Sequence, residues 1–125
     1  MSKEIISQQD IEKIEKIIRD RKISHTYLIN NCKRVYGKFV ELEEESFAKG
    51  SLDKYTKELI ALGISIIQNC ESCMEWHISQ ALTNGATKEQ ILETVGVAIE
   101  MGGGPATVAS RFAVKVLEYH LQTIK

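Results

Sequence analysis

The residues of this chain that are best suited to chemistry lie in one short segment, between Asn69 and His77. Two of the three cysteines, Cys70 and Cys73, form a C-x-x-C pair there, and His77 follows the second cysteine by four residues. Because each residue of a helix turns by about 100°, these three side chains would share one narrow helical face. Only the thiolate form of cysteine is a good nucleophile, and a nearby base or positive field favours it. The segment therefore offers a dithiol with a neighbouring base.

A helix over about 70–84 would place this pair in a favourable electrostatic field. Asn69 is a residue type common at helix N-caps, and Asn84-Gly85 is typical of a helix end. Cys70 would then lie in the first helical turn, where the helix dipole favours negative charge. We therefore expect the start of this helix to favour a thiolate.

An acidic residue, Glu58, lies twelve residues before Cys70 in a strongly apolar segment. Such a glutamate could favour the dipole of its helix, pair with a lysine, or be held inside the protein for chemistry. His25 and His120 have no motif around them and are interpreted as ordinary surface or core residues. Cys32 stands alone, and a lone cysteine is usually a small buried hydrophobe. Glu58 is thus the fourth candidate for a site formed with the C-x-x-C segment.

Zinc binding is the main alternative to redox chemistry at this segment. Cys70, Cys73, His77 and Glu58 together would supply four ligands of the types that zinc prefers. Structural zinc sites usually take their ligands from two separated knuckles, however, and the sequence has no second C-x-x-C or H-x-x-H motif. We therefore favour a redox pair, and we expect neither a bound metal nor a cofactor.

Length and composition set limits on the class of protein. A chain of 125 residues is expected to form one domain over 1–125. Its net charge of −1 gives no reason to expect a nucleic-acid partner. No apolar run approaches the length of a membrane span, and residues 1–9 lack the apolar core of a signal peptide. We expect a cytoplasmic protein without a membrane partner, and in a reducing compartment a C-x-x-C pair is more often redox-active or metal-binding than structural.

The apolar residues recur with helical spacing, and a single proline and no strand-like alternation favour an all-α fold. Ser7, Ser24, Asp53 and Thr87 are candidate N-caps, and Pro105 suits the first turn of the last helix. The helices are predicted over about 8–22, 25–48, 54–68, 70–84, 88–101 and 105–122.

The helix predicted over 54–68 is apolar nearly all round, a pattern that is typical of a buried central helix. Together with the helix over 88–101, it carries more apolar surface than a chain of this length can easily hide within itself. We therefore expect a homo-oligomer.

The stretch from Glu58 through Cys70-Glu71-Ser72-Cys73 to His77 resembles the alkylhydroperoxidase, or AhpD-like, branch of the carboxymuconolactone decarboxylase family. The pattern of that branch is a glutamate about twelve residues ahead of C-x-x-C-x-x-x-H. The similarity begins near Phe39-Val40-Glu41-Leu42-Glu43 and continues through Asn84-Gly85-Ala86-Thr87 to Gly102-Gly103-Gly104-Pro105-Ala106. The lactone decarboxylases of the family generally lack the cysteine pair, so its presence favours the redox branch.

The resemblance implies an AhpD-like helical bundle of about six helices that assembles as a trimer or hexamer. It also implies a thiol-dependent peroxidase or disulfide oxidoreductase of antioxidant type. Its partners would be a hydroperoxide substrate and a reductant that is a dithiol protein or a lipoyl-type donor. The residues of its proton-relay site would be Glu58, Cys70, Cys73 and His77.

The spacing of these residues suggests a mechanism in which His77, assisted by Glu58, takes the proton from a cysteine thiol. We favour Cys73 as the attacking thiol because it lies one turn from His77, with Cys70 resolving. The reverse assignment stays open, since Cys70 is nearer the helix N-terminus. Two other functions also stay open, namely a cysteine-independent decarboxylase or isomerase acting on a small lactone, and a non-catalytic oligomeric module.

Overall fold

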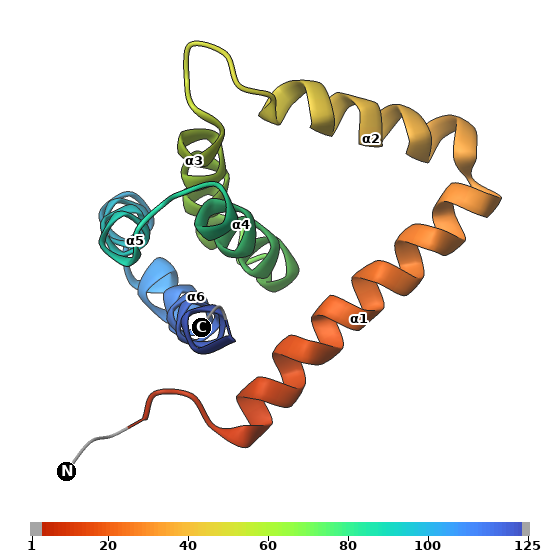
Figure 1. Cartoon of the computed structure of the whole chain (residues 1–125). Helices are drawn as coiled ribbons and strands as arrows, with labels where there is room; N and C mark the ends of the chain where they lie inside the picture. Colours follow the sequence, from red (N-terminus) through yellow and green to blue (C-terminus); the bar gives the residue numbers. More distant parts are fainter. Residues whose placement is uncertain (1–3, 124–125) are drawn as a thin grey trace.

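The computed structural model describes residues 4–123. Within this range the chain forms six α-helices and no strand, which confirms the all-α prediction (Figure 1). The elements are α1 (Gln8–Asn31), α2 (Lys33–Phe47), α3 (Lys54–Ile67), α4 (Glu71–Thr83), α5 (Lys88–Gly102) and α6 (Gly104–Thr123).

The last four helices form a bundle, and α1 runs along its side against α4 and α6 (Figure 1). The core lies between these five helices, and its buried residues include Ile14, Leu62, Ile66, Met74, Ile78, Ile91, Val95, Ala113, Val116 and Leu117. Met74 and Ile78 are fully buried on the inward face of α4. Their burial holds α4 in the centre of the bundle, so the cysteine segment at its start has a rigid support.

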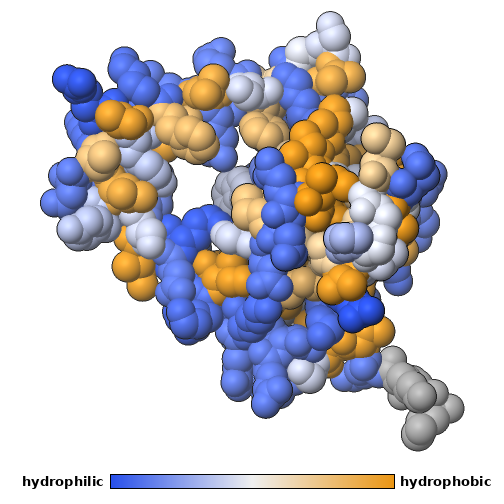
Figure 2. All heavy atoms as spheres, turned by 180° about the vertical axis from the view of Figure 1, so that it is seen from behind, coloured by the Kyte–Doolittle hydropathy of each residue, from blue (hydrophilic) through white to orange (hydrophobic). Residues whose placement is uncertain are grey.

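The second helix forms an arm that leaves α1 at a sharp angle and returns toward α3 (Figure 1). It has no buried residue, and Val35, Phe39 and Leu42 on it are each more than half exposed. Viewed from behind, an opening is visible between this arm and the bundle (Figure 2). Within one chain, the arm therefore leaves its apolar stripe uncovered.

The boundary between the first two helices differs from the sequence prediction. α1 continues to Asn31 and α2 begins at Lys33, so the expected cap at Ser24 is wrong. A serine alone costs a helix little, and neither glycine nor proline supports a break there. The chain turns at Cys32, directly after two asparagines with low helix propensity. Cys32 is also exposed, not buried as its residue type suggested.

Two of the predicted N-caps are confirmed in full. Ser7 and Thr87 each form a capping box, in which the cap side chain and the side chain three residues on each accept a backbone N–H. Asp53 is the N-cap residue of α3, but its side chain makes no capping hydrogen bond. The ends of α3, α5 and α6 lie within a residue of their predicted positions.

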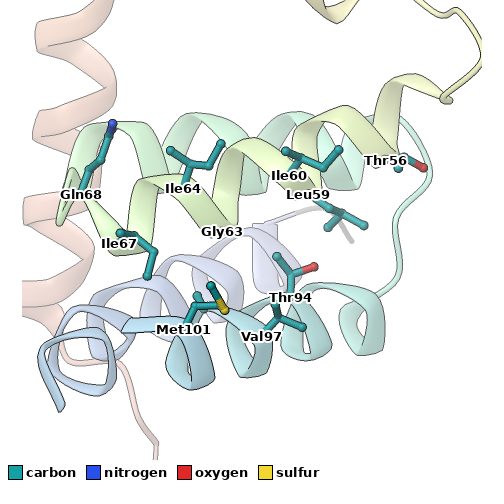
Figure 3. Close-up of a pocket in the computed structure, with 11 residues that line it drawn as sticks. Thr56, Leu59, Ile60, Gly63, Ile64, Ile67, Gln68, Thr94, Val97 and Met101 are labelled. Carbon is teal, nitrogen blue, oxygen red and sulfur yellow. The ribbon is translucent and has the colours of Figure 1, made fainter. Parts of the chain in front are cut away.

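The outer face of α3 differs from the prediction of a fully buried helix. Leu62 and Ile66 are buried, but Ile60, Ile64 and Ile67 are each about half exposed. They line one wall of an apolar groove of about 550 Å³, whose other wall is formed by α5 (Figure 3). The apolar residues of α3 therefore serve two surfaces, the core of this chain and an open groove.

None of the helices in residues 4–123 is both long enough and apolar enough to span a lipid bilayer.

Candidate active site

The cysteine segment begins at a tight turn between α3 and α4. Asn69 has a positive φ of 54°, a backbone conformation that asparagine tolerates better than most residues. The backbone N–H of Cys70 donates to the Ser65 carbonyl at 2.9 Å. Because this turn closes on the end of α3, the first residues of α4 are fixed relative to that helix.

Cys70 is itself the N-cap residue of α4, so the prediction of Asn69 at the cap is wrong by one residue. Its Sγ occupies the place of the usual capping oxygen and accepts the Cys73 backbone N–H at 3.3 Å. The electrostatic part of the prediction remains, since the sulfur lies at the positive end of the α4 dipole. A thiolate at this position would be stabilised by the same N–H group.

The structure contains the oxidised form of the pair. Cys70 and Cys73 are joined by a disulfide with a Cα–Cα distance of 5.2 Å, and both residues are half-buried. The disulfide therefore joins the N-cap residue of α4 to its first turn.

Glu58 and His77 form a buried pair next to this segment. Glu58 on α3 is 2% exposed, and its Oε1 lies 2.7 Å from His77 Nδ1. An ionised carboxylate can only accept, so the imidazole donates through Nδ1–H. The lone pair of the His77 ring then lies on Nε2, the nitrogen that would act as a base. Because Cys73 and His77 are four residues apart on α4, the pair lies about one helical turn from the disulfide.

Two further side chains surround the Glu58–His77 pair. A lysine partner for Glu58 was one of the alternatives that the sequence left open, whereas the sequence pattern did not indicate an aromatic neighbour of His77. Phe47, the last residue of α2, stacks on the His77 ring with 5.4 Å between ring centroids. Lys54 Nζ lies 3.6 Å from Glu58 Oε2, one turn away on α3. The ring partly covers the imidazole from water, and the ammonium balances the charge of the buried carboxylate.

A second carboxylate–histidine pair lies on another side of α4. Glu75 is 1% exposed, and its Oε2 lies 2.6 Å from His120 Nε2 on α6. Its Oε1 lies 2.6 Å from Arg21 Nη1 on α1. This contact is an ion pair, but its geometry does not meet the criteria of a hydrogen bond. His120 is thus an interior histidine with a hydrogen-bond partner, as one of its two expected interpretations held. The spacing of residues in the sequence did not indicate that Glu75 is this partner. An acidic residue directly after the buried Met74 is the one local sign that Glu75 needs a partner.

The ionisation of Glu75 reflects these contacts. Burial alone would raise the pKa of its carboxyl group, but the hydrogen bond with His120 and the charge of Arg21 outweigh it. The net result is a pKa below the ordinary value of a glutamate. Glu75 is therefore a charged, paired residue inside the protein.

The positions of the acidic, histidine and cysteine side chains also bear on the zinc alternative. Within the described part of the chain, no three of them are grouped so that they could hold a metal ion. Cys70 and Cys73 are joined in a disulfide here, and a zinc site would need both as free thiolates.

Comparison with known proteins decides the family. The sequence model described as the carboxymuconolactone decarboxylase family matches residues 33–116, well over half of the chain. The chain belongs to this family. The match covers α2 to α5 and most of α6, and so includes Glu58, both cysteines of the pair and His77.

The proteins to which this chain is similar include two kinds. An uncharacterised protein from the cox locus of Paracoccus denitrificans is 42% identical over 80 residues, which are 64% of this chain and 72% of that protein. An alkyl hydroperoxide reductase AhpD from Corynebacterium kroppenstedtii is 38% identical over 55 residues. That match spans 44% of this chain but 32% of the AhpD protein. It supports the AhpD-like branch while covering a minor part of the reductase.

A solved member of the carboxymuconolactone decarboxylase family, from Thermotoga maritima, has the same fold. It superimposes with a TM-score of 0.78 at 28% identity, over 87% of this chain and 92% of that one. A part in the antioxidative response has been suggested for that protein. The likeness extends over nearly all of both chains, so the six-helix architecture is that of the family.

The lowered pKa of Glu75 predicts how stability depends on pH. A carboxyl group with a depressed pKa in the folded state stabilises the protein above its unfolded pKa, and this contribution is lost as the pH falls through the folded value. We expect Glu75→Gln to destabilise the protein at pH 7 and to flatten the loss of stability below about pH 4.3, the ordinary glutamate pKa. Chemical denaturation at a series of pH values measures this. An acid transition identical to wild type would contradict it, and Glu89→Gln on the first turn of α5 is the exposed control.

Proposed function

We propose that this protein is a thiol-dependent peroxidase and disulfide oxidoreductase. One observation carries the proposal: a buried Glu58–His77 pair lies about one helical turn from a C-x-x-C disulfide that caps α4. A base, a dithiol and a helix N-terminus are the three components that thiol activation needs. Membership of the family and the partial match to AhpD proteins support the same function.

The catalytic cycle begins with the reduced pair. His77 Nε2 takes the proton of the Cys73 thiol, and the imidazolium is stabilised by the Glu58 carboxylate. The Cys73 thiolate attacks the terminal oxygen of a hydroperoxide, so that an S–O bond forms while the O–O bond breaks. The alkoxide leaves with a proton as an alcohol, and Cys73 becomes a sulfenic acid.

The second cysteine completes the oxidation. Cys70 attacks the sulfenic sulfur, an S–S bond forms and water leaves, which gives the disulfide form of the structure. A dithiol reductant, either a protein or a lipoyl-type donor, then returns two electrons and two protons by thiol–disulfide exchange. The close spacing of the pair suits both steps, since the two cysteines are near enough to be joined directly.

The surroundings of His77 support its proposed role as a base. Lys54 offsets the charge of Glu58, and the ring of Phe47 shields the imidazole. Glu58 orients the ring and fixes its tautomer through Nδ1, as a carboxylate does for a catalytic histidine in other enzymes. Glu58 therefore acts through His77, Lys54 acts through Glu58, and Phe47 acts on the His77 ring.

We also propose that the chain works as a homo-oligomer, in keeping with the trimers and hexamers implied by the family resemblance. The exposed face of α2 is one apolar surface of the chain, and the groove between α3 and α5 (Figure 3) is another. A second copy that places its α2 face in this groove would cover both. Such a contact joins unlike surfaces, and repeated contacts of this kind form a closed ring when the rotation between successive copies closes.

The relay predicts a specific pattern of activity in three variants. His77→Ala should slow hydroperoxide turnover with a dithiol by about 10²–10⁴-fold near neutral pH, because general-base assistance is worth that much. Part of the loss should return at alkaline pH, where solvent ionises the thiol. Glu58→Gln should show the same pattern more weakly, whereas Cys73→Ser should show no alkaline recovery, because the disulfide cannot close.

The control for these variants is His25→Ala, since His25 lies on α1 and bonds Tyr36 instead of a carboxylate. Full activity in both the His77 and Glu58 variants would refute the relay. Turnover of a small lactone by the double variant Cys70→Ser with Cys73→Ser would instead favour a cysteine-independent decarboxylase or isomerase.

The assembly proposal predicts the mass of the protein in solution. Light scattering at micromolar concentration should give three or six times the chain mass of 14.1 kDa. Ile64→Glu should lower this mass, because it places a charge in the exposed apolar groove, whereas Lys22→Glu on an exposed position of α1 should not. A monomeric mass for the wild-type protein would contradict the proposal.

A further inference from the structure

The two residues between the cysteines, Glu71 and Ser72, are both held by α1. Lys13 Nζ lies 3.0 Å from Glu71 Oε2, and Arg21 Nη2 donates to the Ser72 carbonyl at 2.9 Å and to its Oγ at 3.3 Å. Lys13 and Arg21 are eight residues apart, which is about 12 Å along a helix. α1 thus contacts both residues that lie between the two cysteines. The Cys/His/Glu pattern does not include these contacts.

Of these two cations, Arg21 is the one built into the structure. Lys13 and Glu71 are each about half exposed, and an exposed ion pair of this kind contributes little. Arg21 is 26% exposed; its Nη1 meets the buried Glu75, and its guanidinium lies 5.3 Å from the Trp76 ring centroid. The guanidinium is thus contacted by Glu75 and Ser72 at its edges and by the Trp76 ring at its face. These contacts pre-organise it, so its charge and hydrogen bonds stay in place.

The anchor of Arg21 is itself fixed from a third helix. Glu75 Oε2 is bonded to His120 on α6, so one carboxylate, two residues after Cys73, joins α1, α4 and α6. The ion pair has a direction: Arg21 extends from Glu75 to Ser72, the residue directly before Cys73. Its positive end is therefore bonded to a residue between the two cysteines, and its negative end is the buried Glu75.

We propose that Arg21 is a positioning residue of the redox pair, with Glu75 and His120 as its anchor. The charge of Arg21 and its hydrogen bonds to Ser72 bias the pair toward the thiolate and therefore toward the dithiol form. The proposal rests on the proposed function only in that the pair cycles between disulfide and dithiol. In the exchange with dithiothreitol, the protein S–S bond breaks and takes two electrons and two protons, while dithiothreitol closes its own disulfide. A positive charge near the thiolate lowers the thiol pKa and favours the reduced protein.

The proposal predicts opposite effects for the two members of the ion pair. Arg21→Gln removes the positive end, so the pKa of the first thiol to ionise should rise and the exchange equilibrium should shift toward the protein disulfide. Glu75→Gln leaves the Arg21 charge without its counter-charge, so both quantities should change in the other direction. We expect changes of about threefold or more in each equilibrium, as for a charge near but not touching the sulfur. Arg21→Lys keeps the positive charge but loses the planar group that bonds Glu75 and Ser72 together. Its thiol pKa and exchange equilibrium should stay nearer to those of the wild-type protein.

Other charged groups around the segment must be the same in every comparison. These are Lys13 and Glu71 at its exposed edge, and Glu58, His77 and Lys54 beside α4. None of them is changed in the variants, so a difference between variants reports the Arg21–Glu75 pair and the His120 anchor. Arg19→Gln, an exposed change of the same type on α1, is the matched control.

The experiment measures the thiolate absorbance of the reduced protein against pH, and the ratio of its dithiol and disulfide forms in dithiothreitol mixtures. Arg21→Gln leaves the buried Glu75 without its cation and can fail to fold. The double variant Arg21→Gln with Glu75→Gln avoids this, and its difference from Glu75→Gln alone isolates the Arg21 charge. We expect the double variant to have the higher thiol pKa of the two.

A purely structural role predicts lower melting temperatures with unchanged thiol pKa and unchanged exchange equilibrium, and that result would overturn the inference. So would shifts of the same sign in Arg21→Gln and Glu75→Gln. Failure of the proposed function is a different outcome, in which the opposite shifts are present but hydroperoxide is not reduced by the wild-type protein.

Discussion

A carboxylate that is buried in a helical bundle must be paired, and this constraint sets the position of α4. Glu58 and Glu75 are both almost fully buried, and each pairs with a histidine on a different helix. The Glu58–His77 pair joins α3 to α4, and the Glu75 pairings join α4 to α1 and α6. Lys54 is a second partner of Glu58 and Arg21 a second partner of Glu75. Only the loss of all partners of one carboxylate would leave an uncompensated charge in the interior, at a cost of about 3–5 kcal/mol. The helix that carries the cysteines is therefore held by charges on more than one side.

The start of α4 combines a cap with a reactive group. A sulfur atom takes the place of the usual capping oxygen at Cys70, and its partner N–H belongs to Cys73. The capping hydrogen bond and the helix dipole both favour negative charge at this atom. The field that stabilises the helix end thus favours a thiolate at Cys70, the resolving cysteine of our proposal, whereas the Glu58–His77 pair supplies a base to Cys73. In our proposal, local helix geometry and redox chemistry depend on the same few atoms.

The sequence was sufficient for those features that follow from local patterns. The capping boxes at Ser7 and Thr87 and the helical class depend on neighbours in the chain, and these predictions are confirmed. The break expected at Ser24 is wrong because one cap residue does not outweigh continued helix formation on both sides. The exposed half of α3 was also missed, because an apolar residue packs equally well on a core or on an uncovered groove.

The pairing of distant polar residues was beyond reach of the sequence patterns. Glu75 and His120 are 45 residues apart, and Arg21 precedes Glu75 by 54, so their contact depends on how three helices pack. The spacing of Glu58, Cys70, Cys73 and His77 did indicate one site, but not the cover provided by Phe47 from α2. Such contacts arise from tertiary packing, which helical periodicity does not encode.

One single-turnover measurement tests the central claim most directly. The reduced protein is mixed with one equivalent of an organic hydroperoxide, and both the alcohol formed and the thiols remaining are counted. The proposed chemistry predicts one alcohol per chain, loss of two thiols and a Cys70–Cys73 disulfide found by peptide mapping. Intact thiols with no alcohol formed, or equal peroxide consumption by the variant with both cysteines changed to serine, would contradict it.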